Sequence, residues 1–321
     1  MTLHITESDV RQLFTMKMAI DAVESACRKQ AAGIVIVHPR RRFELPNGGF
    51  FHYMAAVDTE AGYIAMKQYT YVKGTLRFLV PLYEISTGAL LALIEADYMG
   101  QLRTGAASGV ATKYLARRDA KVAAIIGTGG QARTQLEAVA TVRKLEFARA
   151  YGRDPELRAA FCAEMSNSLG LKVEQANSAA DAVRGVDIVT TATTSAKPVL
   201  SGSDLSRGVH VNAIGANHAH KRELDDRTIE IADLIFVDSI EQSKQEAGDL
   251  IIPFEKTLEK WAQVHELAEL VTGKAPGRSR DSQITLFKSN GIAAWDLASA
   301  IAVYDAARSQ HRGTEIPFFA S

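Results

Sequence analysis

The stretch Val122-Ala-Ala-Ile-Ile-Gly-Thr-Gly-Gly-Gln-Ala132 decides the fold of this chain. Val122–Ile126 is a short, continuous apolar run, which is typical of a central strand in a parallel sheet. The pattern Gly127-x-Gly129-x-x-Ala132 follows at once and provides a tight turn, close backbone approach to a pyrophosphate, and a small residue where a helix packs on the strand. A helix predicted over 132–142 would point its free N–H groups at the phosphates. The stretch therefore predicts a dinucleotide-binding unit with contacts from Gly127, Thr128, Gly129, Gly130, Gln131 and Ala132.

Strand and helix patterns alternate from Lys121 onward, which favours a parallel sheet with right-handed crossovers. Further strands are expected over 146–151, 171–175, 186–190, 209–214 and 234–237. Ligands of such sheets bind at the carboxyl ends of the strands. Small and polar residues follow two of these strands and suit close approach to ribose and nicotinamide, although such residues also cap helices: Thr191, Ala192, Thr193, Gly215 and Ala216.

The N-terminal third has a different character. A helix is predicted over 16–31, and β-rich segments over 50–56, 63–71, 76–85 and 89–94 are separated by turns such as Pro46–Gly49. These segments predict an antiparallel meander, followed by a small-residue-rich helix over 98–115. A final helix over 293–309 lies beyond the alternating region and can return to pack on the N-terminal domain.

Composition excludes several classes of protein. The 321 residues include 37 Lys plus Arg and 37 Asp plus Glu, so no charge excess indicates nucleic acid or an anionic membrane as partner. No apolar run approaches the roughly 20 residues of a membrane span, and the N-terminus lacks a signal-peptide pattern. Cys27 and Cys162 are far apart in sequence and outside any metal or redox motif. We expect a cytoplasmic protein without a metal.

The end of the second strand of the dinucleotide unit bears on the choice of cofactor. An acidic residue about 20 positions past the glycine turn binds the ribose of NAD, but Gly152 occupies that position and Arg153 follows it. A guanidinium can hold a 2′-phosphate bidentately. This pattern favours NADP over NAD. In the alternative, Arg153 is a solvated turn residue and Asp154 binds the ribose of NAD.

Three cations of the N-terminal domain lie in apolar surroundings: Arg41, Lys67 and Arg103. A buried charge needs an anionic partner, which a substrate carboxylate or a structural Asp or Glu could supply. His218 and His220 lie near the end of the fifth predicted strand without a third metal ligand. They can be proton donors or polar loop residues.

Several segments together resemble the ornithine cyclodeaminase/mu-crystallin family. They run in the family's order and cover most of the chain: Met66-Lys67, Arg103–Gly109, Ile126–Ala132, Val211–Asn217, Arg222–Asp225 and Phe287–Gly291. The resemblance implies an α/β fold, in which a Rossmann-type doubly wound parallel sheet (116–291) is inserted in an α+β substrate-binding and dimerisation domain (1–115 plus 292–321). It further implies a homodimer, a carboxylate clamp at Arg41, Lys67 and Arg103, and cofactor contacts at Thr104, Ser289 and Gly291.

One departure from the family pattern concerns catalysis. Cyclodeaminases carry an aspartate after the fifth strand, where this chain has Asn217. An amide cannot act as a general base near neutral pH. We therefore expect an NAD(P)H-dependent reductase of a small imino acid, or an amino acid dehydrogenase, with Lys67, Arg103 and Asn217 at the catalytic centre. Two alternatives remain open, an ornithine cyclodeaminase with tightly bound NAD and a non-catalytic NADP-linked binding protein.

Overall fold

A computed structural model describes residues 1–46 and 48–318. Two compact units make up the chain: one comprises Met1–Arg103 together with the residues from Gly291 onward, and the other comprises Thr104–Asn290. Asn47, in the turn expected at 46–49, and residues 319–321 of the expected first domain lie outside the described residues.

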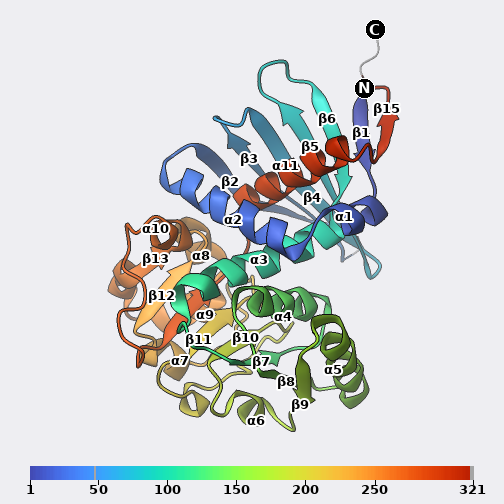
Figure 1. The fold of residues 1–321 in the computed structure, drawn as a ribbon. Helices are drawn as coiled ribbons and strands as arrows, with labels where there is room; N and C mark the ends of the chain where they lie inside the picture. The colour runs from blue at the N-terminus through green and yellow to red at the C-terminus, as the bar shows by residue number, and fades with distance from the viewer. Residues whose placement is uncertain (47, 319–321) are drawn as a thin grey trace. The chain divides into compact units, whose positions relative to one another are not determined.

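The second unit contains the parallel sheet that the glycine turn and its flanks predict (Figure 1). Eight strands pair in parallel in the order β13-β12-β14-β11-β10-β7-β8-β9. Their bounds are β7 (Val122–Ile126), β8 (Phe147–Tyr151), β9 (Lys172–Gln175), β10 (Ile188–Thr191), β11 (His210–Ala213), β12 (Leu234–Val237), β13 (Val264–Glu266) and β14 (Thr285–Lys288). Parallel strands of this kind are buried on both faces, and the strands β7, β10, β11 and β14 are almost entirely buried.

Helices connect these strands, as parallel pairing requires. They are α4 (Gly130–Val142), α5 (Pro155–Leu169), α6 (Ala179–Val183), α7 (Asp226–Ile231), α8 (Ile240–Glu246), α9 (Gly248–Phe254) and α10 (Leu267–Val271), with the 3₁₀ turns η1 (Gly202–Asp204) and η2 (Leu258–Gln263). The chain runs outward from β7 through β8 to β9 and then returns to β10 on the other side of β7. The direction of winding thus reverses between β7 and β10, which is where doubly wound sheets bind ligands.

The first unit is built on a seven-stranded sheet in the order β15-β1-β6-β5-β4-β3-β2. The expected antiparallel meander is present as β3 (Phe50–Asp58), β4 (Tyr63–Val72), β5 (Thr75–Glu84) and β6 (Leu90–Glu95). Three further strands were not expected from the sequence: β1 (Thr2–Ile5), β2 (Val35–Glu44) and β15 (Thr314–Ile316).

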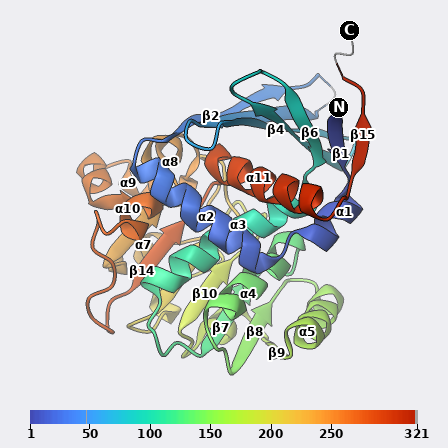
Figure 2. The same cartoon turned by 45° about the horizontal axis from the view of Figure 1, so that its top comes forward.

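Helices cover one face of this sheet. α11 (Ala293–Ser309) packs across β2 to β5, and α2 (Met16–Ala31) lies alongside α11 (Figure 2). Both helices have the bounds that the sequence predicts. α1 (Glu7–Leu13) begins at a capping box, in which Thr6 and Asp9 satisfy each other's backbone N–H groups.

The two units divide within α3 (Asp97–Leu115), between Arg103 and Thr104, whereas the sequence suggested a boundary after 115. The later part of α3 belongs to the second unit because it forms hydrogen bonds and close backbone contacts with other residues of that unit. Asn212 Nδ2 donates to Thr112 Oγ1 over 3.0 Å, and a Cβ at Gly105 would lie 2.4 Å from the carbonyl oxygen of Thr134. Among the described residues, no helix is both long and apolar enough to cross a membrane.

Candidate active site

The glycine turn joins β7 to α4 in a backbone conformation that suits an anion. Gly127 has φ +110°, and a Cβ there would lie 2.3 Å from the carbonyl oxygen of Ala192. Gly129 is the N-cap of α4 and offers no side chain to the helix N–H groups, while the space beside its Cα is open. The N–H of Ala132 donates to the Gly129 carbonyl oxygen over 3.1 Å, and the preceding N–H groups of Gly130 and Gln131 suit a phosphate.

A cleft of about 530 Å³ lies at the carboxyl ends of β7, β8 and β10. Its volume is within the range of small-molecule sites. It is lined by eight residues that the sequence indicates for the cofactor: Gly127, Thr128, Gly129, Gly152, Arg153, Asp154, Ala192 and Thr193. These residues suit a dinucleotide, since three glycines let a ligand approach the backbone and an arginine can bind a phosphate.

The remaining cofactor candidates lie elsewhere. Gly130, Gln131 and Ala132 form the first turn of α4, with Ala132 buried beneath it, and Thr104 begins the second unit. Thr191 is the last residue of β10, and Gly215 and Ala216 lie in the segment after β11. The Ser289 hydroxyl is buried and donates to Asp238 Oδ2 over 3.2 Å. Gly291 belongs to the first unit, where a Cβ would lie 2.5 Å from Nη1 of Arg103.

The residues after β8 bear on the choice between a 2′-phosphate and a free ribose hydroxyl. Gly152 packs against Thr128, and a Cβ there would lie 2.5 Å from its Oγ1. The Asp154 carboxylate caps α5 and accepts from the N–H groups of Glu156 (2.9 Å) and Leu157 (3.0 Å). Both of these bonds use Oδ1, and Arg153 and Asp154 both line the cleft with exposed side chains.

Lys67, Arg103 and Asp296 form a buried charge cluster in the first unit. Lys67 Nζ and Arg103 Nε donate to the same oxygen, Asp296 Oδ1, over 3.0 and 2.9 Å. The three residues are 4%, 5% and 1% exposed. Asp296 Oδ2 has no hydrogen-bond partner among residues 1–46 and 48–318. One carboxylate thus neutralises only one of two buried cations.

The electrostatics follow from this imbalance. Burial and the charge of Arg103 lower the pKa of Lys67 from 10.5 to about 8, although Asp296 opposes the shift. Burial alone would raise the pKa of Asp296, but Arg103 and Lys67 outweigh it and hold that pKa below its ordinary value. The cluster keeps a net positive charge near neutral pH, which is the condition for binding an anion.

Sequence reasoning missed Asp296. Lys67 comes from β4, Arg103 from α3 and Asp296 from α11, so the three meet only in the folded unit. The available signal was an acidic residue in the first turn of a helix that is otherwise almost entirely apolar near its start.

Of the arginines in β2, Arg40 and not Arg41 acts on Lys67. Arg41 is exposed and pairs in register with Tyr53, on the sheet face opposite to the one that carries Lys67. Arg40 is half-buried, donates to the Gly291 carbonyl over 3.3 Å, and its charge contributes to lowering the pKa of Lys67.

Asn217 follows β11, half-buried, next to the buried Ala216. The rings of His218 and His220 lie 5.6 Å apart in the same loop.

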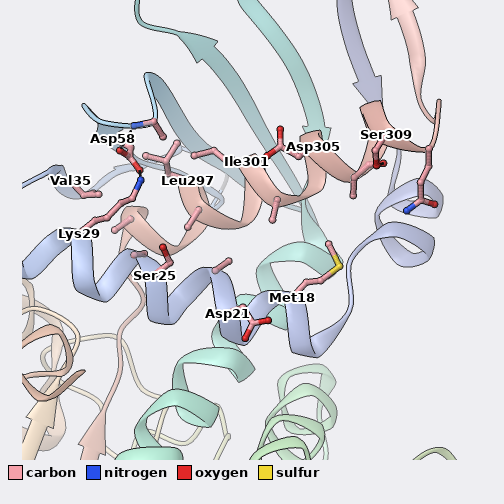
Figure 3. A pocket seen from close by; sticks show the side chains of 18 residues that line it. Met18, Asp21, Ser25, Lys29, Val35, Asp58, Leu297, Ile301, Asp305 and Ser309 are labelled. Atoms are coloured by element: carbon pink, nitrogen blue, oxygen red, sulfur yellow. Dashed lines mark hydrogen bonds and ion pairs between the residues drawn. The ribbon is translucent and has the colours of Figure 1, made fainter. Parts of the chain in front are cut away.

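A larger cavity of about 710 Å³ is a groove between α2 and α11 in the first unit (Figure 3). Small and apolar side chains line most of it. Its lysine, Lys29, is already paired with Asp58 over 2.8 Å, and Asp21 with Lys17 over 2.6 Å. This groove lacks the unbalanced charge of the Lys67 cluster, and we do not assign the chemistry to it.

Comparison with known proteins gives a consistent result. The model of the ornithine cyclodeaminase/mu-crystallin family matches residues 2–311. A Delta(1)-pyrroline-2-carboxylate reductase of Bacillus cereus is 40% identical over 247 residues, which are 77% of this chain and 76% of that protein. The structure of Thermococcus litoralis Delta(1)-pyrroline-2-carboxylate reductase in complex with NADH and L-proline matches with a TM-score of 0.94 at 38% identity, covering 98% of this chain and 100% of that one. An archaeal alanine dehydrogenase dimer with bound NAD matches with a TM-score of 0.92 at 35% identity, covering 99% of each chain.

Proposed function

The chain belongs to the ornithine cyclodeaminase/mu-crystallin family, and we propose that it is an NAD(P)H-dependent reductase of a small imino acid of the 1-pyrroline-2-carboxylate type. The observation that carries the proposal is the buried cluster in which Lys67 and Arg103 share one oxygen of Asp296. Its excess positive charge suits a substrate carboxylate. The relatives described as Delta(1)-pyrroline-2-carboxylate reductases support the same substrate class.

Lys67 and Arg103 bind and orient the substrate in this proposal. Charge-assisted hydrogen bonds from the two cations fix the carboxylate, and the adjacent C=N carbon is thereby oriented. Asp296 holds both cations in place through Oδ1. Arg40, rather than Arg41, is the arginine that adds to the positive potential at this site.

The bound dinucleotide supplies the hydride. In this chain, the first turn of α4 would hold the pyrophosphate, and Arg153 would hold the 2′-phosphate of NADP. Gly152 and Arg153 support NADP over NAD, since the expected acid position carries no carboxylate and an exposed guanidinium lines the cleft beside it. The relatives with bound NADH or NAD make NAD the alternative.

Asn217 favours reduction over cyclodeamination. An amide can donate and accept hydrogen bonds and so orient a substrate nitrogen, but it cannot remove a proton from an amine near neutral pH. Reduction of an iminium carbon needs no such base, whereas ornithine cyclisation in the family's usual manner does.

We propose a homodimer that forms through the face of the seven-stranded sheet opposite to α11. Phe43, Phe51 and Tyr53 stack on one another on that face with centroid distances of 6.0 to 6.4 Å. Phe43 is 58% exposed and Ile36 is 52% exposed. Exposed aromatic clusters of this kind mark interfaces, and the related archaeal alanine dehydrogenase is a dimer.

The proposed location is the cytoplasm. Reduced nicotinamide dinucleotides are used there, and the buried Cys27 and Cys162, neither of which is in a disulfide, suit a reducing compartment.

The test is oxidation of NADPH and, separately, NADH with a panel of imines: 1-pyrroline-2-carboxylate, 1-piperideine-2-carboxylate, and pyruvate with ammonia. The proposal expects turnover with at least one cyclic imino acid and a preference for NADPH. Absence of turnover with every imine would refute it. Proline formed from L-ornithine without net change in nicotinamide absorbance would establish the cyclodeaminase instead.

A further inference from the structure

Glu223 lies buried between the ends of two neighbouring strands of the dinucleotide unit. Its Oε1 accepts from the backbone N–H (2.6 Å) and the hydroxyl (2.7 Å) of Thr193, after β10. Its Oε2 accepts from the hydroxyl of Thr191 (2.9 Å) and from the N–H of Gly215 (2.7 Å), after β11. One carboxylate thus receives four hydrogen bonds from two chain segments. Two backbone N–H groups and two hydroxyls stabilise the ionised form, whereas burial raises the pKa of Glu223.

A second carboxylate and a lysine support the backbone of Glu223. Asp249 Oδ1 accepts from the N–H groups of Glu223 (2.7 Å) and Leu224 (2.9 Å). Lys288, at the end of β14, is fully buried with its Nζ 3.1 Å from Asp249 Oδ2, and it donates to the carbonyl oxygen of Ala216. The loop from Gly215 to Glu223 is therefore held at both ends by one connected network, and Asn217 lies directly beyond the Lys288 contact.

The packing leaves little freedom for this arrangement. A Cβ at Gly215 would lie 2.2 Å from the Thr193 carbonyl oxygen and 2.5 Å from Glu223 Oε1. A Cβ at Gly248 would lie within 2.7 Å of the carbonyl oxygens of His218, Ala219 and Lys221. Glycine at both positions lets the backbone approach closely, so the loop is seated against β10 on one side and α9 on the other.

We propose that Glu223, supported by Asp249 and Lys288, is a positioning residue that sets the ends of β10 and β11 for the nicotinamide half of the dinucleotide. In a doubly wound sheet, one half of the strands binds the adenosine moiety and the other half, here β10, β11 and β14, binds the nicotinamide moiety. Thr193 lines the cofactor cleft. The inference rests on the proposed function only in that the chain binds a nicotinamide dinucleotide.

The decisive variant is Glu223→Gln, because a Gln side chain keeps the size but offers an NH₂ group to two donors that need an acceptor. Binding is measured with NADPH and with 2′-phospho-ADP-ribose, which lacks the nicotinamide. Affinity for NADPH should fall about tenfold or more while affinity for the fragment stays within about twofold. With an imine substrate, kcat should fall about 100-fold, as expected for a small misplacement of reacting groups, and the primary isotope effect with 4-deuterated NADPH should rise.

Two further variants keep the test clear. Glu230→Gln changes an exposed carboxylate on α7 that forms an ion pair with Arg227 (3.4 Å), and it should leave both affinities unchanged. Thr191→Val removes a single donor to Glu223, so it should also lower the affinity for NADPH relative to that for the fragment, by a smaller factor. If Glu223→Gln does not fold, Thr191→Val replaces it in the test.

Equal losses of affinity for NADPH and for the fragment would overturn the inference, because the network would then be a general support of the fold. Unchanged affinities in Glu223→Gln, or in Thr191→Val if that variant alone folds, would also overturn it. A wild-type protein that binds NADPH but reduces no imine would refute the proposed reaction and leave this binding test intact.

Discussion

Replacing Lys67 by Met should weaken substrate binding and, near neutral pH, stabilise the fold. Lys67 is 4% exposed and its pKa lies at about 8 rather than 10.5. That difference corresponds to roughly 3 kcal/mol against the charged form in the folded state. Met has a similar length and volume and carries no charge, and replacing buried charges by well-packed apolar groups is often neutral or stabilising.

The pH dependence follows from the two pKa values. In the unfolded chain Lys67 keeps its proton up to its ordinary pKa of 10.5, whereas in the folded chain it loses the proton at about 8. Between these values the unfolded state binds more protons, so the stability of the wild type rises with pH across this window. Below about pH 8 the full penalty is present. The free energy of unfolding of Lys67→Met should therefore be up to roughly 3 kcal/mol higher than that of the wild type near neutral pH. This difference should disappear by about pH 10.5.

The assay is urea unfolding of wild type and Lys67→Met at several pH values, together with KM for the imino acid. Loss of one of two charged contacts to a carboxylate should raise KM about 100-fold. A variant that is less stable than the wild type near neutral pH, with an unchanged KM, would show that Lys67 serves the fold and would refute the assignment.

Three further substitutions test other parts of the account. Arg153→Ala should raise KM for NADPH about tenfold to 100-fold and leave KM for NADH unchanged. Equal effects on the two KM values would contradict a contact between Arg153 and the 2′-phosphate. Asn217→Asp should lower imine reduction and permit release of proline from L-ornithine, which is measured by amino acid analysis; failure to gain any such activity would show that position 217 does not separate the two reactions. Phe43→Glu should convert a dimer to a monomer in sedimentation, and a dimer that persists would place the interface elsewhere.

Much of the fold could be predicted because its signals are local. The glycine turn after an apolar run marks β7 and α4, and the apolar periodicity of α2 and α11 marks both helices to their ends. β14 (Thr285–Lys288) escaped prediction because it pairs between β11 and β12, which are distant from it in sequence. β2 escaped because its three consecutive arginines resemble a solvated loop.

Several features of the site could not be predicted from the local sequence. Lys67 and Arg103 stand out as charges among apolar neighbours, but their shared partner, Asp296, is about 190 residues or more away and is chosen by tertiary packing. The choice of Arg40 over Arg41 depends on a bulge in β2 between His38 and Arg41. One extra residue in a strand moves every later side chain to the opposite face, and nothing in the local pattern reveals it.

The most direct test of the central claim compares 1-pyrroline-2-carboxylate with 1-pyrroline, which lacks the carboxylate, in the wild type and in Lys67→Met. If the Lys67 and Arg103 cluster binds the substrate carboxylate, the wild type should prefer the carboxylated imine in kcat/KM by about 100-fold or more, and the variant should lose most of that preference. A preference that is the same in both proteins would contradict the account.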